Sequence, residues 1–223
     1  MTNFRLLSTK ELLPPQKRRF IEWGCDLTAY NFIRIKPLNF SFSTLHEHLI
    51  FTSQNGVNAF FEPYPMQAQW KSKKVFCVGE KTKALLKAKG FTWIYMEENA
   101  NALAEILLKQ ENNTKAFSFI CGKRRRPEIE NKLKEHNITV DCIETYTTEL
   151  QSKSFGPQDG ILFFSPSGVE SYLQKNKLGT AQCFALGPST AAALAPYSSD
   201  IHTAKKPTLD HLGLCVHQYL NTN

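Results

Sequence analysis

Residues 161–172 read ILFFSPSGVESY, and residues 49–60 read LIFTSQNGVNAF. Each stretch begins with an apolar run typical of a buried strand, continues with Ser-x-x-Gly-Val, and ends in a pattern typical of a helix. The serines of the two stretches, Ser53 and Ser165, lie 112 residues apart. A chain that repeats such a unit is expected to hold two related α/β halves.

A second pair of segments repeats at nearly the same distance. Residues 77–85 read CVGEKTKAL, and residues 185–194 read ALGPSTAAAL. Each fits an apolar strand, then Gly-x-x-Thr, then a helix, and Thr82 and Thr190 are 108 residues apart. One match of this kind would be weak, but two at similar offsets argue for an internal duplication.

A third, fainter repeat joins residues 4–36 to residues 117–149. Both fit a strand, a basic helix, a turn and a second strand. The first helix is expected to end at Gly24, which is a favourable C-terminal cap, and the later helix near Asn137. The chain therefore holds four units in the order A, B, A′, B′. The residue patterns leave open whether the halves are sequential or whether A pairs with B′ and encloses the other two.

Strands and helices alternate along the whole chain, which predicts an α/β protein with parallel sheets covered by helices. One long strand is expected over Leu27–Ile35, and helices are expected over Val57–Phe61 and Ala102–Gln110, among others. The stretches Leu27–Leu38 and Val140–Leu150 are long for α/β strands, so they could serve as two connectors between domains.

The charge balance favours polyanionic partners. The 223 residues carry 27 Lys and Arg against 20 Asp and Glu, a net charge of +7. Such a balance attracts nucleic acid, an acidic membrane surface or a small molecule with many carboxylates, and does not choose among them. No run of 18 apolar residues is present, and the N-terminal stretch lacks the apolar core of a signal peptide. We therefore expect a cytoplasmic protein without a membrane span.

The cysteines and histidines do not predict a metal site. The six cysteines include no CxxC pair, and in a reducing cytosol they are expected to be small buried hydrophobes. His46 and His48 form an HxH pair with no third ligand nearby, so surface or half-buried histidines are the simpler interpretation. The chain also lacks the GxxxxGK(S/T), GxGxxG, GxSxG and HExxH motifs of nucleotide-binding proteins and hydrolases.

Five segments that follow predicted strands carry small residues or hydroxyls, and each leads into a helix start. Helix N-termini offer free backbone N–H groups and a favourable dipole to anions, although any one such segment can be a plain cap or turn. Five together favour a site for several anionic groups. The segments are 53–56, 79–82, 121–125, 165–168 and 187–190.

The densest basic run is Lys123–Arg126. It fits a solvated helix start, and it also fits a contact for a polycarboxylate or a phosphate backbone. No aromatic residues interleave with it, and no nucleic-acid-binding motif is present, so nucleic acid is not the expected partner.

These motifs resemble the uroporphyrinogen-III synthase family over nearly the whole chain. The strongest parts of the resemblance are FFSPSG at 163–168 and ALGPST at 185–190. It extends to LIFTSQNGVNAF (49–60), FCVGEKTKALL (76–86), FICGKRRRPEIENKL (119–133), ETYTT (144–148) and TAKKPTLDHL (203–212).

The resemblance implies an α/β fold of two similar domains, each a parallel sheet flanked by helices, with a cleft between them. Residues 1–36 together with 149–223 would form one discontinuous domain, and residues 37–148 would form an inserted domain. Two strands would join the domains as a hinge, and the protein would be a monomer.

The resemblance also implies the reaction. The substrate would be hydroxymethylbilane, a linear tetrapyrrole octacarboxylate of porphyrin and heme biosynthesis. The enzyme, a hydro-lyase, would remove water, invert ring D and close the macrocycle to uroporphyrinogen III, with no cofactor and no metal. Contact with hydroxymethylbilane synthase would be at most transient, and neither nucleic acid nor a membrane would be a partner.

Residue roles carry over position by position. Tyr146 matches the family's cleft tyrosine, which could donate a proton to the departing hydroxyl or orient a ring; a packing role alone is the alternative. The resemblance places substrate contacts at Lys10, Ser53, Asn55, Thr82, Gly122, Ser165, Ser167, Gly168, Ser189 and Thr190.

Two positions depart from the family pattern. The family commonly shows Thr-Arg where this chain has Thr9-Lys10, and it often has a basic residue at the position of Asn55. Both changes weaken the expected binding of carboxylates. Lys10 can bind a carboxylate only as a point charge, and Asn55 carries no charge. Lys123–Arg126 would compensate or would merely be exposed. The alternative is therefore a non-catalytic homologue, which binds a tetrapyrrole or another polyanion without converting it.

Overall fold

The computed structural model describes residues 4–109 and 116–222. The chain divides into two compact units, Met1–Arg34 with Glu149–Asn223 and Ile35–Thr148. The chain passes between them twice, in β3 (Ile33–Pro37) and in β8 (Thr139–Leu150). No helix in the described part of the chain is long and apolar enough to cross a membrane.

The first unit is a parallel five-stranded sheet in the order β11-β10-β9-β1-β2. Leu6 and Phe184 face α1 and α8, whereas Leu7 and Ile161 face α6 and α7, so helices cover both faces. The strands are β1 (Phe4–Ser8), β2 (Cys25–Ala29), β9 (Gly160–Phe163), β10 (Gln182–Ala185) and β11 (Ile201–Thr203). The helices are α1 (Pro14–Glu22), α6 (Pro166–Leu173), α7 (Pro188–Leu194) and α8 (Leu209–Thr222).

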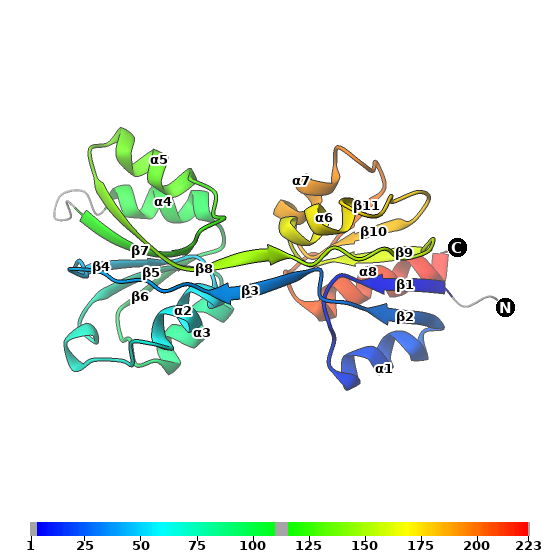
Figure 1. Ribbon diagram of the computed structural model, residues 1–223, viewed down its shortest axis with the longest axis horizontal. Helices are drawn as coiled ribbons and strands as arrows, with labels where there is room; N and C mark the ends of the chain where they lie inside the picture. Colours follow the sequence, from blue (N-terminus) through cyan, green and yellow to red (C-terminus); the bar gives the residue numbers. More distant parts are fainter. Residues whose placement is uncertain (1–3, 110–115, 223) are drawn as a thin grey trace. The chain divides into compact units, whose positions relative to one another are not determined.

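The second unit has a six-stranded sheet in the order β3-β8-β7-β4-β5-β6. Figure 1 shows α2 and α3 on one face of this sheet and α4 and α5 on the other. The remaining strands are β4 (His48–Phe51), β5 (Lys74–Val78), β6 (Ile94–Glu97) and β7 (Ala116–Gly122). The helices are α2 (Gln54–Phe61), η1 (Ala68–Trp70), α3 (Glu80–Ala88), α4 (Ala100–Lys109) and α5 (Glu128–Glu135).

The two sheets repeat one topology. The order β11-β10-β9-β1-β2 corresponds strand for strand to β6-β5-β4-β7-β8, and β3 is the extra strand of the second unit. Each sheet thus combines an early segment with a late one, so A lies with B′ and B with A′. Gly24 and Asn137, which follow α1 and α5, both have a positive φ, 82° and 58°. This left-handed conformation ends helices, as expected at these two positions.

The strand predicted over Leu27–Ile35 is wrong. The structure has β2 and β3 there, and they belong to different sheets. Phe32 lies between them and is fully buried in the cluster with Phe163 and Tyr172. Burial of this ring turns the chain out of the first sheet, an effect of tertiary packing that an apolar run does not reveal.

Two backbone hydrogen bonds fix β3 against β8. The Leu38 N–H donates to the Thr145 carbonyl at 2.9 Å, and the Gln151 N–H donates to the Phe32 carbonyl at 2.8 Å. Phe32 is therefore bonded to Gln151 and Leu38 to Thr145, so residue numbers rise along one strand as they fall along the other. The two strands run antiparallel, as their arrows do in Figure 1.

Helices begin earlier than predicted. The helix expected from Val57 starts at Gln54, and its repeat starts at Pro166. The polar Ser-x-x-Gly segments are therefore helix caps with the first helical turn and not loops. The helix expected over Ala102–Gln110 starts at Ala100, and Gln110 lies outside the described residues.

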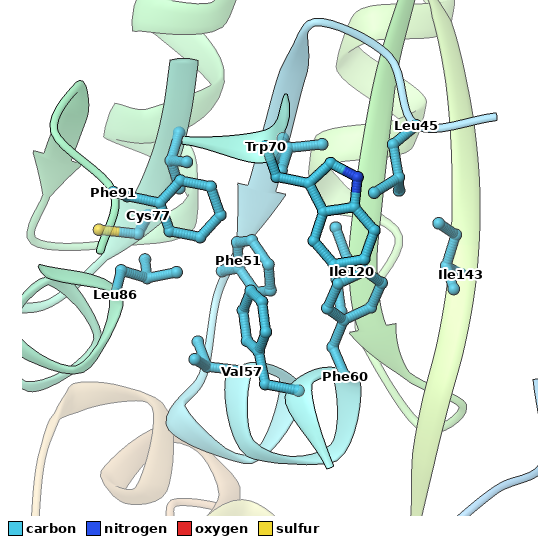
Figure 2. Close-up of a cluster of buried hydrophobic side chains, with 13 residues drawn as sticks. Leu45, Phe51, Val57, Phe60, Trp70, Cys77, Leu86, Phe91, Ile120 and Ile143 are labelled. Carbon is cyan, nitrogen blue, oxygen red and sulfur yellow. The ribbon is translucent and has the colours of Figure 1, made fainter. Parts of the chain in front are cut away.

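Aromatic side chains dominate the core of the second unit. Figure 2 shows Phe51, Phe60 and Trp70 packed between α2 and the sheet. Phe60 is fully buried, and its ring centroid lies 5.1 Å from that of Phe61 and 5.6 Å from that of Trp70. This cluster fixes α2, and therefore the residues at its N-terminus, against the carboxyl ends of the strands.

His48 is expected to make the protein less stable in acid. It is buried between Phe76 and Phe117, and this burial, together with Lys74 and Lys73, lowers its pKa, which Glu47 partly opposes. In the unfolded chain the histidine binds its proton with a pKa near 6.5. Neutral His48 therefore contributes its full stabilisation above that pH, and the free energy of unfolding should decrease as the pH falls below it.

Urea unfolding between pH 7.5 and 5.5 measures this loss. His48→Gln, which carries no charge at either pH, should show a flatter dependence than the wild-type protein. Equal slopes in the two proteins would remove His48 from the explanation.

Candidate functional site

Ser53 and Tyr146 form the centre of the candidate site in the second unit. The hydroxyl groups of the two side chains lie 2.9 Å apart. Ser53 is the N-terminal cap of α2, and its Oγ accepts the Gly56 N–H at 3.1 Å. Tyr146 comes from β8, so the contact joins a strand to a helix start. The structure therefore brings together two residues that the family resemblance placed in one site.

A β-bulge directs Tyr146 toward Ser53. Cys121 pairs with Glu144, but the next residue of β7, Gly122, pairs with Tyr146, so Thr145 is the extra residue. Thr145 is fully buried, and its hydroxyl donates to the Cys121 carbonyl at 3.4 Å. Bulges commonly reorient a side chain in this way.

Gly122 gives the Tyr146 ring its place. A Cβ at position 122 would lie 2.6 Å from Cζ and 2.8 Å from Cε2 of Tyr146, closer than any real contact. The ring therefore rests directly on the backbone of β7. The resemblance assigned Gly122 to the approach of substrate, whereas in this structure the tyrosine ring occupies the space above it.

The environment keeps the Tyr146 phenol protonated. Burial raises its pKa, the hydrogen bond with Ser53 lowers it, and Cys121 raises it further, with a net increase. A neutral phenol can donate its proton or a hydrogen bond at physiological pH.

The first unit repeats the helix cap. Ser165 caps α6, and its Oγ accepts the Gly168 N–H at 3.1 Å, as in the Ser53 cap. Thr9 lies against this turn, because a Cβ on Gly168 would be 3.5 Å from the Thr9 hydroxyl oxygen. The Thr9 hydroxyl donates to the Leu162 carbonyl at 2.8 Å and so joins β1 to β9. Thr9 was not among the predicted contacts, although the Thr9-Lys10 pair of the family pattern and its place directly after the first strand pointed to this position.

The remaining predicted contacts differ in exposure. Thr82 and Thr190 are buried, with 4% and 3% of their surface exposed, and each donates its backbone N–H to the capping glycine carbonyl at the start of its helix. Both are third residues of their helices, α3 and α7, which preserves the repeat. Lys10 and Ser189 are exposed, and Asn55 and Ser167 are half-buried.

The basic run separates into residues with different surroundings. Lys123 and Arg126 are exposed, and Arg126 pairs with Glu128 at 3.6 Å. Arg125 is 22% exposed and forms ion pairs with Glu130 at 2.5 Å and Glu144 at 2.8 Å. Its charge is thus matched within the protein. The basic run alone could not predict this, because Glu144 lies on another strand.

The thiols differ in their expected reactivity. A hydrogen bond with Cys121 lowers the pKa of Cys142, burial opposes this, and the Arg125 guanidinium lowers the pKa further. Burial raises the pKa of Cys77 to about 12 and that of Cys25 to about 11. In the described part of the chain, no cluster of histidines, cysteines and carboxylates could hold a metal ion.

Iodoacetamide should therefore modify the half-buried Cys142 and Cys215 before the four buried cysteines of the folded protein, because the thiolate is the reacting species and burial disfavours it. Peptide mass mapping at increasing reagent exposure gives the order of modification. Early labelling of Cys77 would contradict the burial seen in the structure.

Comparisons with known proteins agree on one family. A family model described as uroporphyrinogen-III synthase HemD matches residues 17–213. The uroporphyrinogen-III synthetase of Helicobacter pylori is similar in structure, with a TM-score of 0.71 and 16% identity over 99% of this chain and 100% of that one. A mutant uroporphyrinogen III synthase of Thermus thermophilus has a TM-score of 0.69 and 13% identity over 99% and 100%. At such identities the structures show a shared fold.

Proposed function

Because the chain belongs to the uroporphyrinogen-III synthase family, we propose that it converts hydroxymethylbilane into uroporphyrinogen III, as a hydro-lyase of tetrapyrrole biosynthesis. The reaction removes the terminal hydroxyl as water, inverts ring D and closes the macrocycle. The family match spans most of the chain, and the hydrogen-bonded pair Ser53–Tyr146 is the observation that carries the proposal. The proposal includes that the protein acts as a monomer in the cytoplasm and requires no cofactor.

Tyr146 is the proposed proton donor to the departing hydroxyl. Its raised pKa keeps the proton on the phenol until substrate is present. Ser53 Oγ already accepts the Gly56 N–H, which fixes its position and leaves it able to orient the phenol. General acid catalysis of this kind contributes about 10²- to 10⁴-fold to a rate.

In each unit, the helix starts are proposed as binding positions for substrate carboxylates. Ser165, Ser167, Ser189 and Lys10 in one unit and Asn55 in the other retain exposed or half-buried polar groups. Charge-assisted hydrogen bonds to backbone N–H groups and hydroxyls would hold the flexible chain with its ends close together. The buried Thr82 and Thr190 would then stabilise these helix starts through their backbone hydrogen bonds to Gly79 and Gly187.

Tyr146→Phe should lower kcat/KM by about 10²-fold, because it removes the transferable proton and retains the ring on Gly122. Ser53→Ala should cost about tenfold, because the phenol remains but is no longer oriented. Kinetics of type III isomer formation from enzymatically supplied hydroxymethylbilane measure both. A Tyr146→Phe enzyme within threefold of wild type would assign the tyrosine a packing role.

The alternative is a homologue that binds a tetrapyrrole without turnover, favoured only by the departures at Lys10 and Asn55. Tight binding of uroporphyrinogen III together with no turnover would support it. We further propose that substrate arrives by free diffusion. Co-migration of the protein with hydroxymethylbilane synthase at micromolar concentration would contradict that route.

A further inference from the structure

Arg125 links three elements around the candidate site of the second unit. Its Nε donates to Glu130 Oε1 at 2.5 Å, and its Nη1 donates to Glu144 Oε1 at 2.8 Å. Glu130 lies on α5 and Glu144 on β8. The guanidinium thus bridges a helix and the strand that carries Tyr146, two residues beyond Glu144.

The same residue holds the backbone beneath the tyrosine ring. The Arg125 N–H donates to the Gly122 carbonyl at 3.2 Å, and Nη1 lies 3.5 Å from that carbonyl oxygen. The Lys123 N–H donates to the Tyr146 carbonyl at 2.8 Å. The segment from Gly122 to Arg125 is therefore tied to β8 on both sides of the bulge, and the ring of Tyr146 rests on this segment.

Burial and charge show that these contacts are maintained. Arg125 and Glu130 are only 22% and 18% exposed. Burial disfavours the charge on Arg125, but the hydrogen bonds with Glu144 and Glu130 outweigh it, and the pKa of Arg125 is raised. One oxygen of Glu130, Oε2, is buried with no hydrogen-bond partner among the described residues. The other, Oε1, accepts from the Arg125 guanidinium at 2.5 Å and from the Cys142 thiol at 3.6 Å, and Arg125 supplies the positive charge that compensates this carboxylate. Loss of Arg125 would leave it uncompensated.

We propose that Arg125 is a positioning residue for Tyr146: it holds Gly122 under the phenol ring through Glu144 and Glu130, and it does not bind substrate. Its effect on catalysis rests on the proposed function, whereas its effect on the tyrosine does not. The basic run thus contains one internal brace, whose guanidinium is directed to protein carboxylates.

Titration of Tyr146 tests the brace without substrate. Ultraviolet difference absorbance between each protein and its Tyr146→Phe derivative isolates this phenol. Arg125→Met should move the Tyr146 pKa toward its ordinary value, because the loosened segment admits water, and Arg125→Lys should give a smaller shift. Arg19→Met, which breaks an exposed ion pair with Asp210 in the other unit, should leave the titration unchanged.

Kinetics test the consequence for the reaction, at a temperature where circular dichroism shows each variant folded. Arg125→Met should lower kcat about tenfold or more with KM within about threefold, and Arg125→Lys should recover part of kcat. A rise in KM with kcat preserved would make Arg125 a substrate contact and overturn the proposal. An unchanged Tyr146 titration in folded Arg125→Met would overturn it equally.

If Arg125→Met does not fold, Glu144→Gln replaces it, because it keeps the side-chain shape and removes one carboxylate; the Tyr146 pKa should shift in the same direction, and no shift would count against the brace. If the wild-type protein forms no type III isomer, the proposed function fails, while the titration still decides the positioning role.

Discussion

Gly122→Ala should disable the site while leaving the fold largely intact. The added Cβ would lie 2.6 Å from Tyr146 Cζ, so the ring must move by the order of an ångström and lose the Ser53 contact. Misplacement of a catalytic group by about 1 Å can cost about 10²-fold in rate. The strain itself should destabilise the protein by about 1–3 kcal/mol, as insertion of a methyl group into packed structure does. Kinetics of isomer formation and urea unfolding measure the two effects.

A matched pair of variants separates the clash from the change at glycine. Gly156→Ala is the control, because a Cβ there would meet nothing within 4 Å in the described part of the chain. Its stability should be unchanged or slightly higher. Adding Gly122→Ala to a Tyr146→Ala background should cost little stability, because the clashing ring is gone. Equal costs of Gly122→Ala in both backgrounds would show that the ring does not occupy this position.

Phe60→Ala should cause the largest loss of stability, about 3–5 kcal/mol, because removal of a fully buried ring leaves a cavity. Phe60 packs on Phe51, Phe61 and Trp70 within the cluster of Figure 2. Since typical domains are stable by about 5–15 kcal/mol, the second unit should unfold readily in this variant. Chemical denaturation monitored by far-ultraviolet circular dichroism follows the change.

Trp93→Ala is the control for Phe60→Ala. Trp93 is a larger side chain but is 59% exposed, so its removal should change the free energy of unfolding by no more than about 0.5 kcal/mol. Similar losses of stability in the two variants would show that the Phe60 ring is not buried in the core.

The repeated motifs predicted the two α/β sheets because each strand and each cap is encoded locally. The serine caps at Ser53 and Ser165 have nearly the same backbone conformation and the same hydrogen bond to a glycine. The helix ends at Gly24 and Asn137 depend on single residues that tolerate positive φ. Such features can be inferred from sequence without knowing the fold.

Features set by tertiary packing could not be predicted from the local sequence. The division of the predicted Leu27–Ile35 strand follows from burial of Phe32 against side chains more than 100 residues away. The bulge at Thr145 and the brace at Arg125 depend on the register of β7 with β8, which no local pattern specifies. The family resemblance placed Tyr146 and Ser53 in one site, whereas their contact and the role of Gly122 beneath the ring required the structure.

The isomer formed in a coupled reaction decides whether this protein is a uroporphyrinogen-III synthase in function. Porphobilinogen and hydroxymethylbilane synthase supply the substrate, the protein is added, and the products are oxidised and separated into type I and type III isomers. We expect a shift from type I, the product of uncatalysed closure, to type III. Type I alone, from a sample that circular dichroism shows to be folded, would rule out the synthase reaction and leave tetrapyrrole binding without turnover as the function.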